Sequence, residues 1–267
     1  MEKITAVFFD VDGTILNSKH EMLESTRIVL KRLEELDIPY AIASARGPGA
    51  IFPLFKNFDF HSAMVSYNGA LIYDKDAKLL QSLGLSLLEA KEIVHFIEEL
   101  EPEVLINVYS YQDWIVKDAE HPRVKLEETI VGEYARTAKI KDLQSDKVHK
   151  IFCIGEPDSI LNLEQALKEK FSHLYIARSS NQDVQVNMTG VNKAQGVKIL
   201  ADFWGIDLKD SIAFGDSYND IEMLQTVGRG FVMGNGDEKL KELLGNYTDD
   251  NDSDGIYLAM QSLGLFD

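Results

Sequence analysis

The chain has 267 residues, of which 45% are apolar and 27% charged, and its formal net charge at pH 7 is −17. This length suits one large domain or two unequal ones. Lys and Arg are scattered along the sequence, whereas a protein that binds duplex nucleic acid needs a dense basic surface. We therefore expect neither nucleic acid nor an anionic membrane as a partner. An anionic metabolite stays possible as a binding partner, because a bound metal ion reverses the local charge.

The sequence has no run of 18 or more uncharged apolar residues, so we expect no membrane-spanning helix. We also expect no secretory signal, because an apolar strand that ends at charged Asp10 begins within a few residues of Met1. Cys153 is the only cysteine, which excludes a disulfide framework and a cysteine-based zinc site. A cytoplasmic location is the expectation that follows.

The first part of the chain alternates short apolar runs with helical patterns. Ile4–Phe9, Tyr40–Ala43 and Ala63–Val65 predict buried strands. Apolar residues spaced along Leu23–Leu36 predict an amphipathic helix, and a second helix is expected around 51–55. Strand, helix and strand in this order predict right-handed crossovers and a parallel sheet with helices on both faces.

The pattern changes at Asn68-Gly69, a turn signal that is followed by a predicted strand at 70–73. The elements expected after it are a turn at 74–78, an apolar pair at 79–80, helices at 89–100 and 159–171, and strands within 104–116 and at 151–154, 174–177 and 183–186. This stretch is α+β in character, so we predict an inserted second domain over residues 80–187.

The first pattern returns in the last part of the chain. The elements expected there are helices at 193–204, at 220–225 and after Asp254, and strands at 211–214 and 231–233. The core domain is therefore predicted from two segments, 1–79 and 188–267. The predicted fold class is α/β, with a doubly wound, Rossmann-like parallel-sheet core and an inserted α+β domain.

The segment Asp10-Val11-Asp12-Gly13-Thr14 directly follows the first predicted strand. Residues i and i+2 of an extended segment point the same way, so Asp10 and Asp12 are expected to face one space. That space lies at the carboxyl end of a strand, where open parallel sheets bind ligands. Two carboxylates this close repel each other unless a cation or a shared proton intervenes. A turn with solvated acids is the alternative interpretation.

Four other polar residues share this placement or point to the same centre. Asp216 and Asp220 follow a predicted strand and suit a hard cation, although a capped helix start has the same sequence pattern. Ser44 also follows a strand, and its hydroxyl suits either phosphate binding or a helix cap. Lys193 opens a predicted helix and is a candidate positive charge for this centre, whereas a lone lysine is more often solvated.

Taken together, these segments resemble the haloacid dehalogenase (HAD) superfamily, in its Cof-type phosphatase branch with a large α+β (C2B-type) cap inserted after the third core strand. The four motifs of that family are matched in order by Asp10–Thr14, Ser44-Ala45-Arg46, Lys193 and Gly215–Asp220. Asn68-Gly69-Ala70 resembles the usual entry to the cap, and Met233-Gly234-Asn235 and Asp254-Gly255 resemble two later landmarks. The resemblance covers almost the whole chain.

The second motif departs from the family pattern, because Ala45 stands where glycine is usual and Pro48 comes one position late. Asn235-Gly236 likewise replaces the usual Asn-Ala pair. Neither departure removes a charged group, so they bear on loop shape and substrate fit.

The resemblance implies a Mg²⁺-dependent phosphatase for small phosphorylated metabolites, with sugar phosphates first among them. It implies that Asp10 attacks phosphorus to form an aspartyl phosphate, and that Asp12 serves as acid and base. The metal residues that it implies are Asp10, Asp12 through its main-chain carbonyl, Asp216 and Asp220, the last of which either supports the metal or orients Lys193. The phosphate-binding residues that it implies are Val11, Ser44, Ala45, Lys193 and Asn219.

Two other functions stay open at this stage. A phosphotransferase or mutase of the same superfamily would share every motif and differ in the acceptor. A metabolite sensor without activity is disfavoured, because the chain keeps all the charged motif residues. Asp250–Gly255 mimics the start of a calcium-binding loop, but Gln261 stands at its twelfth position and no helix leads into it, so an acidic surface loop is expected. The sequence predicts neither the physiological substrate nor the oligomeric state.

Overall fold

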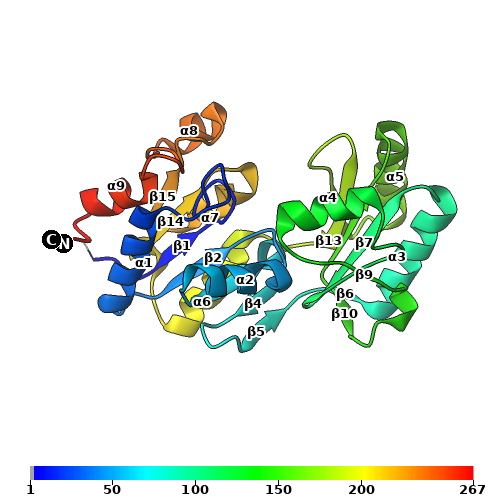
Figure 1. Cartoon of the computed structure of the whole chain (residues 1–267), viewed down its shortest axis with the longest axis horizontal. Coiled ribbons are helices and arrows are strands. Elements are labelled where there is room, and N and C mark those ends of the chain that lie inside the picture. Colours follow the sequence, from blue (N-terminus) through cyan, green and yellow to red (C-terminus); the bar gives the residue numbers. More distant parts are fainter. Residues whose placement is uncertain (1–2, 267) are drawn as a thin grey trace. The chain divides into compact units, whose positions relative to one another are not determined.

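The computed structural model describes residues 3–266 and divides them into two compact units, each of which is described here by itself (Figure 1). The first unit comprises residues 3–45, 54–81 and 192–266, and the second comprises 46–53 and 82–191. The predicted domain limits at 80 and 187 stay a prediction. Residues 46–53, which the sequence analysis assigned to the core, cluster with the second unit, within which the Arg46 guanidinium donates to the Val131 carbonyl at 2.8 Å.

The first unit is built on a sheet with the strand order β15-β14-β1-β2-β3-β4-β5 (Figure 1). The strands are β1 (Val7–Phe9), β2 (Tyr40–Ala43), β3 (Ala63–Ser66), β4 (Leu71–Tyr73), β5 (Leu79–Ser82), β14 (Ile212–Gly215) and β15 (Arg229–Val232). The pairs from β15 to β3 are all parallel, and β4 runs antiparallel to β3. The predicted α/β class with a parallel-sheet core is confirmed.

Helices connect these strands and cover the sheet. They are α1 (Glu24–Glu35), α6 (Lys193–Trp204), α7 (Ile221–Thr226), α8 (Glu238–Leu244) and α9 (Gly255–Ser262), with short 3₁₀ turns η1 (Tyr67–Gly69), η3 (Leu208–Asp210) and η4 (Tyr218–Asp220). Helix α2 (Pro48–Phe58) also follows β2, but only its part from Leu54 onward clusters with this unit. The sequence analysis missed α8. This helix buries only Leu240 and is otherwise dominated by charged and exposed residues, so it lacks an apolar stripe.

Both faces of the parallel sheet are buried, because successive residues of β1 pack against apolar side chains on opposite faces. Phe8 belongs to the apolar cluster that includes Val197 and Leu200 of α6. Its neighbour Phe9, which points to the opposite face, stacks on Phe214 with 5.6 Å between ring centroids. Burial on both faces explains why these strands appear in the sequence as continuous apolar runs without alternation.

The second unit is a largely antiparallel sheet with the strand order β12-β13-β11-β7-β8-β9 and a separate pair β10-β6. Its strands are β6 (Leu85–Ser86), β7 (Leu105–Ser110), β8 (Asp113–Val116), β9 (Arg136–Thr137), β10 (Lys147–Val148), β11 (Lys150–Ile154), β12 (Leu174–Ala177) and β13 (Asp183–Met188). Its helices are α3 (Leu87–Leu100), α4 (Pro122–Val131) and α5 (Pro157–Lys170), with the 3₁₀ turn η2 (Ile140–Asp142).

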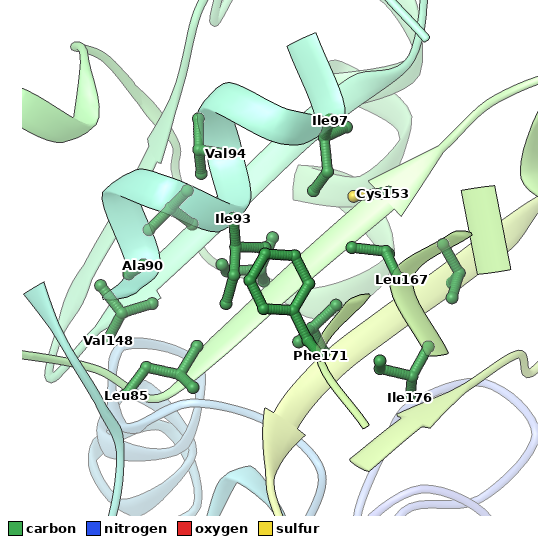
Figure 2. Packing of buried hydrophobic residues seen from close by; sticks show 14 of the residues in the cluster. Leu85, Ala90, Ile93, Val94, Ile97, Val148, Cys153, Leu167, Phe171 and Ile176 are labelled. Carbon is green, nitrogen blue, oxygen red and sulfur yellow. The ribbon is translucent and has the colours of Figure 1, made fainter. Parts of the chain in front are cut away.

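The second unit has an apolar core of its own, formed where α3 and α5 pack on one face of the sheet. Figure 2 shows Ile93 and Ile97 of α3 and Leu167 of α5 pointing toward β11, whose Cys153 lies among them. Each of these side chains is completely buried. A core that draws on two helices and several strands supports the folding of this segment as a unit.

Helix α4 was not predicted, and its sequence explains why. Leu126 and Ile130 are 59% and 50% exposed, whereas the buried positions are Val124 and the charged residue Glu128. The helix therefore carries no apolar stripe that a periodicity argument could detect. Its ends are set by His121, whose ring accepts the Arg123 N–H, and by Gly132 in the left-handed conformation.

His149 ties the beginning of the second unit to the unit's own sheet. Its Nε2 lies 2.9 Å from Ser82 Oγ, and its Nδ1 accepts the Tyr111 N–H at 3.1 Å. Because Nδ1 is an acceptor, the proton of the neutral ring sits on Nε2 and is donated to Ser82. Lys147 Nζ donates to the Ser82 carbonyl at 2.8 Å. Burial, reinforced by the Lys147 charge, lowers the pKa of His149 to about 4.

We expect this buried imidazole to make the protein sensitive to acid. The unfolded chain takes up the His149 proton near pH 6.5 and the folded protein only near pH 4. The contribution of the neutral ring to the free energy of unfolding is therefore fully present above pH 6.5. It decreases as the pH falls toward 4, by at most about 1.4 kcal/mol per pH unit. Urea unfolding between pH 4 and 8 should show a steeper loss for the wild type than for His149→Gln. The control is His95→Gln at an exposed site on α3, and equal slopes for wild type and His149→Gln would contradict the prediction.

Candidate active site

Three neighbouring parallel strands of the first unit end in polar residues at one edge of the sheet. Asp10 follows β1, Ser44 follows β2 and Asp216 follows β14. Strand β1 lies between the other two, with Phe9 in register with both Phe214 and Ile42. The carboxyl ends of adjacent parallel strands meet at the same edge, so the topology alone brings these residues close together.

Lys193 is buried against two carboxylates. Its side chain is 1% exposed, and Nζ donates to Asp10 Oδ1 at 2.5 Å and to Asp220 Oδ1 at 2.6 Å. Asn192 caps the beginning of α6 by accepting the Gln195 N–H at 2.9 Å, which fixes Lys193 at the first helical position. The alternative of a solvated lysine, which the sequence left open, does not apply. The two aspartates hold the pKa of Lys193 above its ordinary value, against the effect of burial.

Both carboxylate oxygens of Asp220 are engaged within the protein. Oδ1 accepts from Lys193, while Oδ2 accepts the backbone N–H groups of Asp216 at 3.1 Å and Ser217 at 3.0 Å. Asp220 is completely buried. These contacts orient Lys193 and fix the loop that carries Asp216. Of the two roles considered for Asp220, the contacts favour orientation of Lys193 over direct support of a metal.

Asp10, Asp216 and Asp220 form a group of carboxylates that suits a metal ion. Each offers an oxygen, and these oxygens lie within 4.8 Å of one another. Burial raises the pKa of Asp10 well above its usual range, opposed by Lys193 and reinforced by Asp220 and Asp216. Burial and the charge of Asp220 raise the pKa of Asp216 to about 6. Crowded, desolvated carboxylates are relieved by a hard cation, and oxygen ligands are those that Mg²⁺ prefers, so the donor set fits Mg²⁺.

Asp12 differs from Asp10 in its surroundings. Asp10 is 5% exposed, whereas the side chain of Asp12 is exposed and is not part of the carboxylate group described above.

Gly13, the residue after Asp12, lies in the turn that follows β1 and has a φ angle of 78°. A Cβ on this residue would come within 2.3 Å of Asp216 Oδ2. Both the left-handed conformation and the close approach of Asp216 therefore require glycine at this position.

The candidate phosphate-binding residues lie on the loops around this edge. Ser44 is 1% exposed, and its N–H donates to the Val65 carbonyl at 2.8 Å. Val11 is buried and Ala45 half-buried. Asn219 is exposed in the middle of η4, where its Nδ2 donates to Asn68 Oδ1 at 3.2 Å. Their roles in binding phosphate stay predictions.

The sequence analysis gave no role to Asn235, which contacts the centre. Its Nδ2 donates to the Gly13 carbonyl at 2.9 Å and lies 3.4 Å from Asp216 Oδ2. Its Oδ1 accepts the Asn251 N–H at 3.1 Å, which sets the orientation of the amide. A signal for Asn235 was present, because it follows β15 and thus stands at the same sheet edge as the other polar residues.

The acidic loop 250–255 holds the segment that follows the first motif. Asp252 Oδ1 accepts both the N–H and the hydroxyl of Ser18 at 3.1 Å, and Asp254 Oδ1 accepts the Ser25 hydroxyl at 2.6 Å. Asn251 Nδ2 donates to the Leu16 carbonyl at 2.9 Å. Oxygens that resemble calcium ligands in the sequence are thus engaged in contacts within the chain.

We expect Lys193→Met to destabilise the metal-free protein strongly, because it leaves Asp10 and Asp220 buried without their cation. Removing one partner of a buried ion pair typically costs about 3–5 kcal/mol. The double variant Lys193→Met/Asp220→Asn should recover part of this loss, since it removes one of the stranded charges. Urea unfolding at pH 8 in chelator measures both. Lys198→Met, at an exposed position of the same helix, is the matched control; a similar loss there would contradict the assigned origin.

The chain matches the family model of haloacid dehalogenase-like hydrolases over residues 7–260. It is 34% identical over 256 residues to a "Putative phosphatase" of Haemophilus influenzae, and the alignment covers 96% of this chain and 97% of the relative. It is 28% identical over 242 residues to the HMP-PP phosphatase of Klebsiella pneumoniae, with 90% and 87% covered. The crystal structure of a haloacid dehalogenase-like hydrolase from Bacteroides thetaiotaomicron superposes with a TM-score of 0.89, at 25% identity, over 98% of this chain and all of that one.

Proposed function

This chain belongs to the haloacid dehalogenase-like hydrolases, in their Cof-type branch, and we propose that it hydrolyses small phosphomonoesters with Mg²⁺ through an aspartyl phosphate on Asp10. Phosphatase activity itself follows from the family and from relatives named as phosphatases. The metal, the intermediate and the substrate are the proposal. The observation that carries it is the contact of Asp10 with Lys193 inside a buried group of carboxylates.

Asp10 suits the role of nucleophile because Lys193 keeps an anion available in a buried place. Burial and two neighbouring carboxylates raise the pKa of Asp10, and the ammonium of Lys193 opposes them directly. Carboxylates attack phosphorus in several enzyme classes. An anionic nucleophile approaches a dianionic ester only where positive charge is provided, and Lys193 is held at the nucleophile itself.

Asp10, Asp216 and the main-chain carbonyl of Asp12 would hold the Mg²⁺ ion. When bound, Mg²⁺ supplies charge neutralisation for the phosphoryl oxygens. The chain's own residues do the rest: Asp220 orients Lys193, and Ser44, Asn219 and the loop residues Val11 and Ala45 bind the phosphoryl oxygens. This division is expected, because phosphoryl transfer depends mainly on positioning and charge neutralisation.

Asp12 suits the role of acid and base. Its carboxyl is exposed, whereas Asp10 two residues earlier is buried. A group that donates a proton to the leaving alcohol, and then takes one from water, must reach both. This difference in burial supports a division of labour between the two carboxylates of the first motif.

The substrates that we propose are small phosphorylated metabolites. Sugar phosphates are our first candidates, and the relatives named HMP-PP phosphatase add that compound to the set. We place the choice of substrate in the inserted domain proposed for residues 80–187, where none of the motifs lies. Turnover of a panel of phosphorylated metabolites by the wild type would identify the substrate, and products that transfer phosphate to an acceptor other than water would favour a phosphotransferase.

Substitution of each of the two carboxylates in the first motif should affect turnover and covalent labelling differently. Asp10→Asn removes the nucleophile and should abolish turnover and covalent labelling together. Asp12→Asn keeps the nucleophile and should lose about 10²–10⁴-fold in turnover of alkyl phosphates. With p-nitrophenyl phosphate, whose leaving group needs no proton, this variant should accumulate phosphoenzyme. Rapid quench and peptide mass spectrometry locate the phosphoryl group.

The matched control for both variants is Asp202→Asn, at an exposed position of α6, which should keep wild-type turnover. A phosphoryl group on Asp12, or an active Asp10→Asn enzyme, would overturn the assigned roles.

We expect activity to require Mg²⁺ and Asp216 to bind it. Because burial and Asp220 disfavour the charged form of Asp216, a bound cation should relieve this cost and raise the melting temperature of the wild type. Asp216→Asn should lose the activity and the Mg²⁺-dependent shift together, while Asp202→Asn should keep both. Differential scanning fluorimetry with Mg²⁺ and with excess chelator measures the shift, and wild-type turnover that persists in chelator would refute the metal requirement.

A further inference from the structure

The turn η1 adopts an unusual backbone conformation beside the candidate active site. Tyr67, Asn68 and Gly69 have φ angles of 48°, 56° and 109° in succession. Only glycine adopts this region without cost, and a non-glycine residue there is uncommon outside Asn and Asp. Two consecutive non-glycine residues in this region are held by their surroundings, and such strain concentrates at functional sites.

Asn68 contacts two of the loops that carry candidate phosphate-binding residues. Its backbone N–H donates to the Ser44 carbonyl at 2.9 Å, and its side-chain Oδ1 accepts from Asn219 Nδ2 at 3.2 Å. These partners follow β2 and β14 respectively, on opposite sides of β1 in the sheet. One residue therefore connects the ends of two strands that do not pair with each other.

The next residue of the turn approaches the third loop. A Cβ on Gly69 would lie 2.4 Å from the carbonyl oxygen of Asn192, which caps the helix that begins with Lys193. The turn thus touches the loops of Ser44, Asn219 and Lys193. All of these residues belong to the first unit.

The residue type at position 68 is explained by a side-chain contact in addition to the backbone conformation. Glycine would adopt φ 56° without strain, as it does at position 69, but it would leave the Asn219 amide without this acceptor. Asparagine tolerates the left-handed region and supplies that acceptor. The side chain of Asn68 is therefore explained by its contact and not by the backbone alone.

We propose that Asn68 is a positioning residue that fixes Asn219, and with it the spacing of the phosphate-binding side chains, an inference that rests on the proposed function. The chain separation between Asn68 and Asn219 is 151 residues, so no local structure sets this spacing. Asn68 acts through Asn219 and through the Ser44 backbone. It does not contact the reacting atoms itself.

The test begins with Asn68→Gly, which keeps the backbone conformation and the N–H while removing the side-chain contact. We expect an unchanged midpoint of urea unfolding, a 10- to 100-fold lower kcat/KM for p-nitrophenyl phosphate, and weaker inhibition by inorganic phosphate; misplacement of a group by about 1 Å costs this much. Asn68→Ala should show a similar loss of kcat/KM with a lower midpoint, because alanine is strained at φ 56°.

A second variant separates positioning from a general structural role. In an Asn219→Ala background, Asn68→Gly should cause no further loss of kcat/KM, because its target is gone. An equal fold-loss in both backgrounds, or a fully active Asn68→Gly enzyme, would overturn the proposal. Asp37→Gly and Asp37→Ala provide the control for the backbone, since Asp37 has φ 53° and lies between α1 and the amino end of β2, at the sheet edge opposite to the one that carries the site residues.

The same variants distinguish this proposal from the proposed function. If the wild type hydrolysed no phosphomonoester, the proposed function would fail, and calorimetric titration of the Mg²⁺-loaded protein with inorganic phosphate would test Asn68 by binding alone. Weaker phosphate binding by Asn68→Gly, absent in the Asn219→Ala background, supports the positioning role. Equal binding by wild type and Asn68→Gly overturns it.

Discussion

The buried ammonium of Lys193 is the constraint on which the arrangement of the candidate site depends. It lies between Asp10 and Asp220, and all three side chains are almost completely removed from solvent. Buried charges are tolerated only where they are paired and hydrogen-bonded. This requirement fixes the beginning of α6 against the ends of β1 and β14, and it keeps an anionic carboxylate at the centre of the site.

Around this charged centre, neutral amides supply geometry. Asn235 links the turn after Asp10 to Asp216, and Asn68 links Asn219 to the Ser44 loop. Amide side chains suit this task because they donate and accept in fixed directions without adding charge. In a reaction that depends on positioning, such contacts matter as much as the charged groups that they hold.

The second unit differs from the first in its sheet and in how that sheet is covered. Its sheet is antiparallel for the most part, and two helices bury one face of it around Ile93, Cys153 and Leu167. Contacts such as those of His149 with Ser82 and Tyr111 lie within the unit itself. The second unit therefore has a core and polar contacts that its own residues supply.

The amino-acid sequence by itself determined the α/β class, the strands that precede Asp10, Ser44 and Asp216, and the family, because these depend on local apolar runs and on short motifs. It did not predict α4, whose exposed Leu126 and Ile130 give no apolar stripe. Only the tertiary structure decided that Lys193 is buried on Asp10, 183 residues away, and that Asn68 meets Asn219. The physical reason is that burial and hydrogen bonding between distant segments arise from how strands are ordered in the sheet, and no local pattern in the sequence encodes that order.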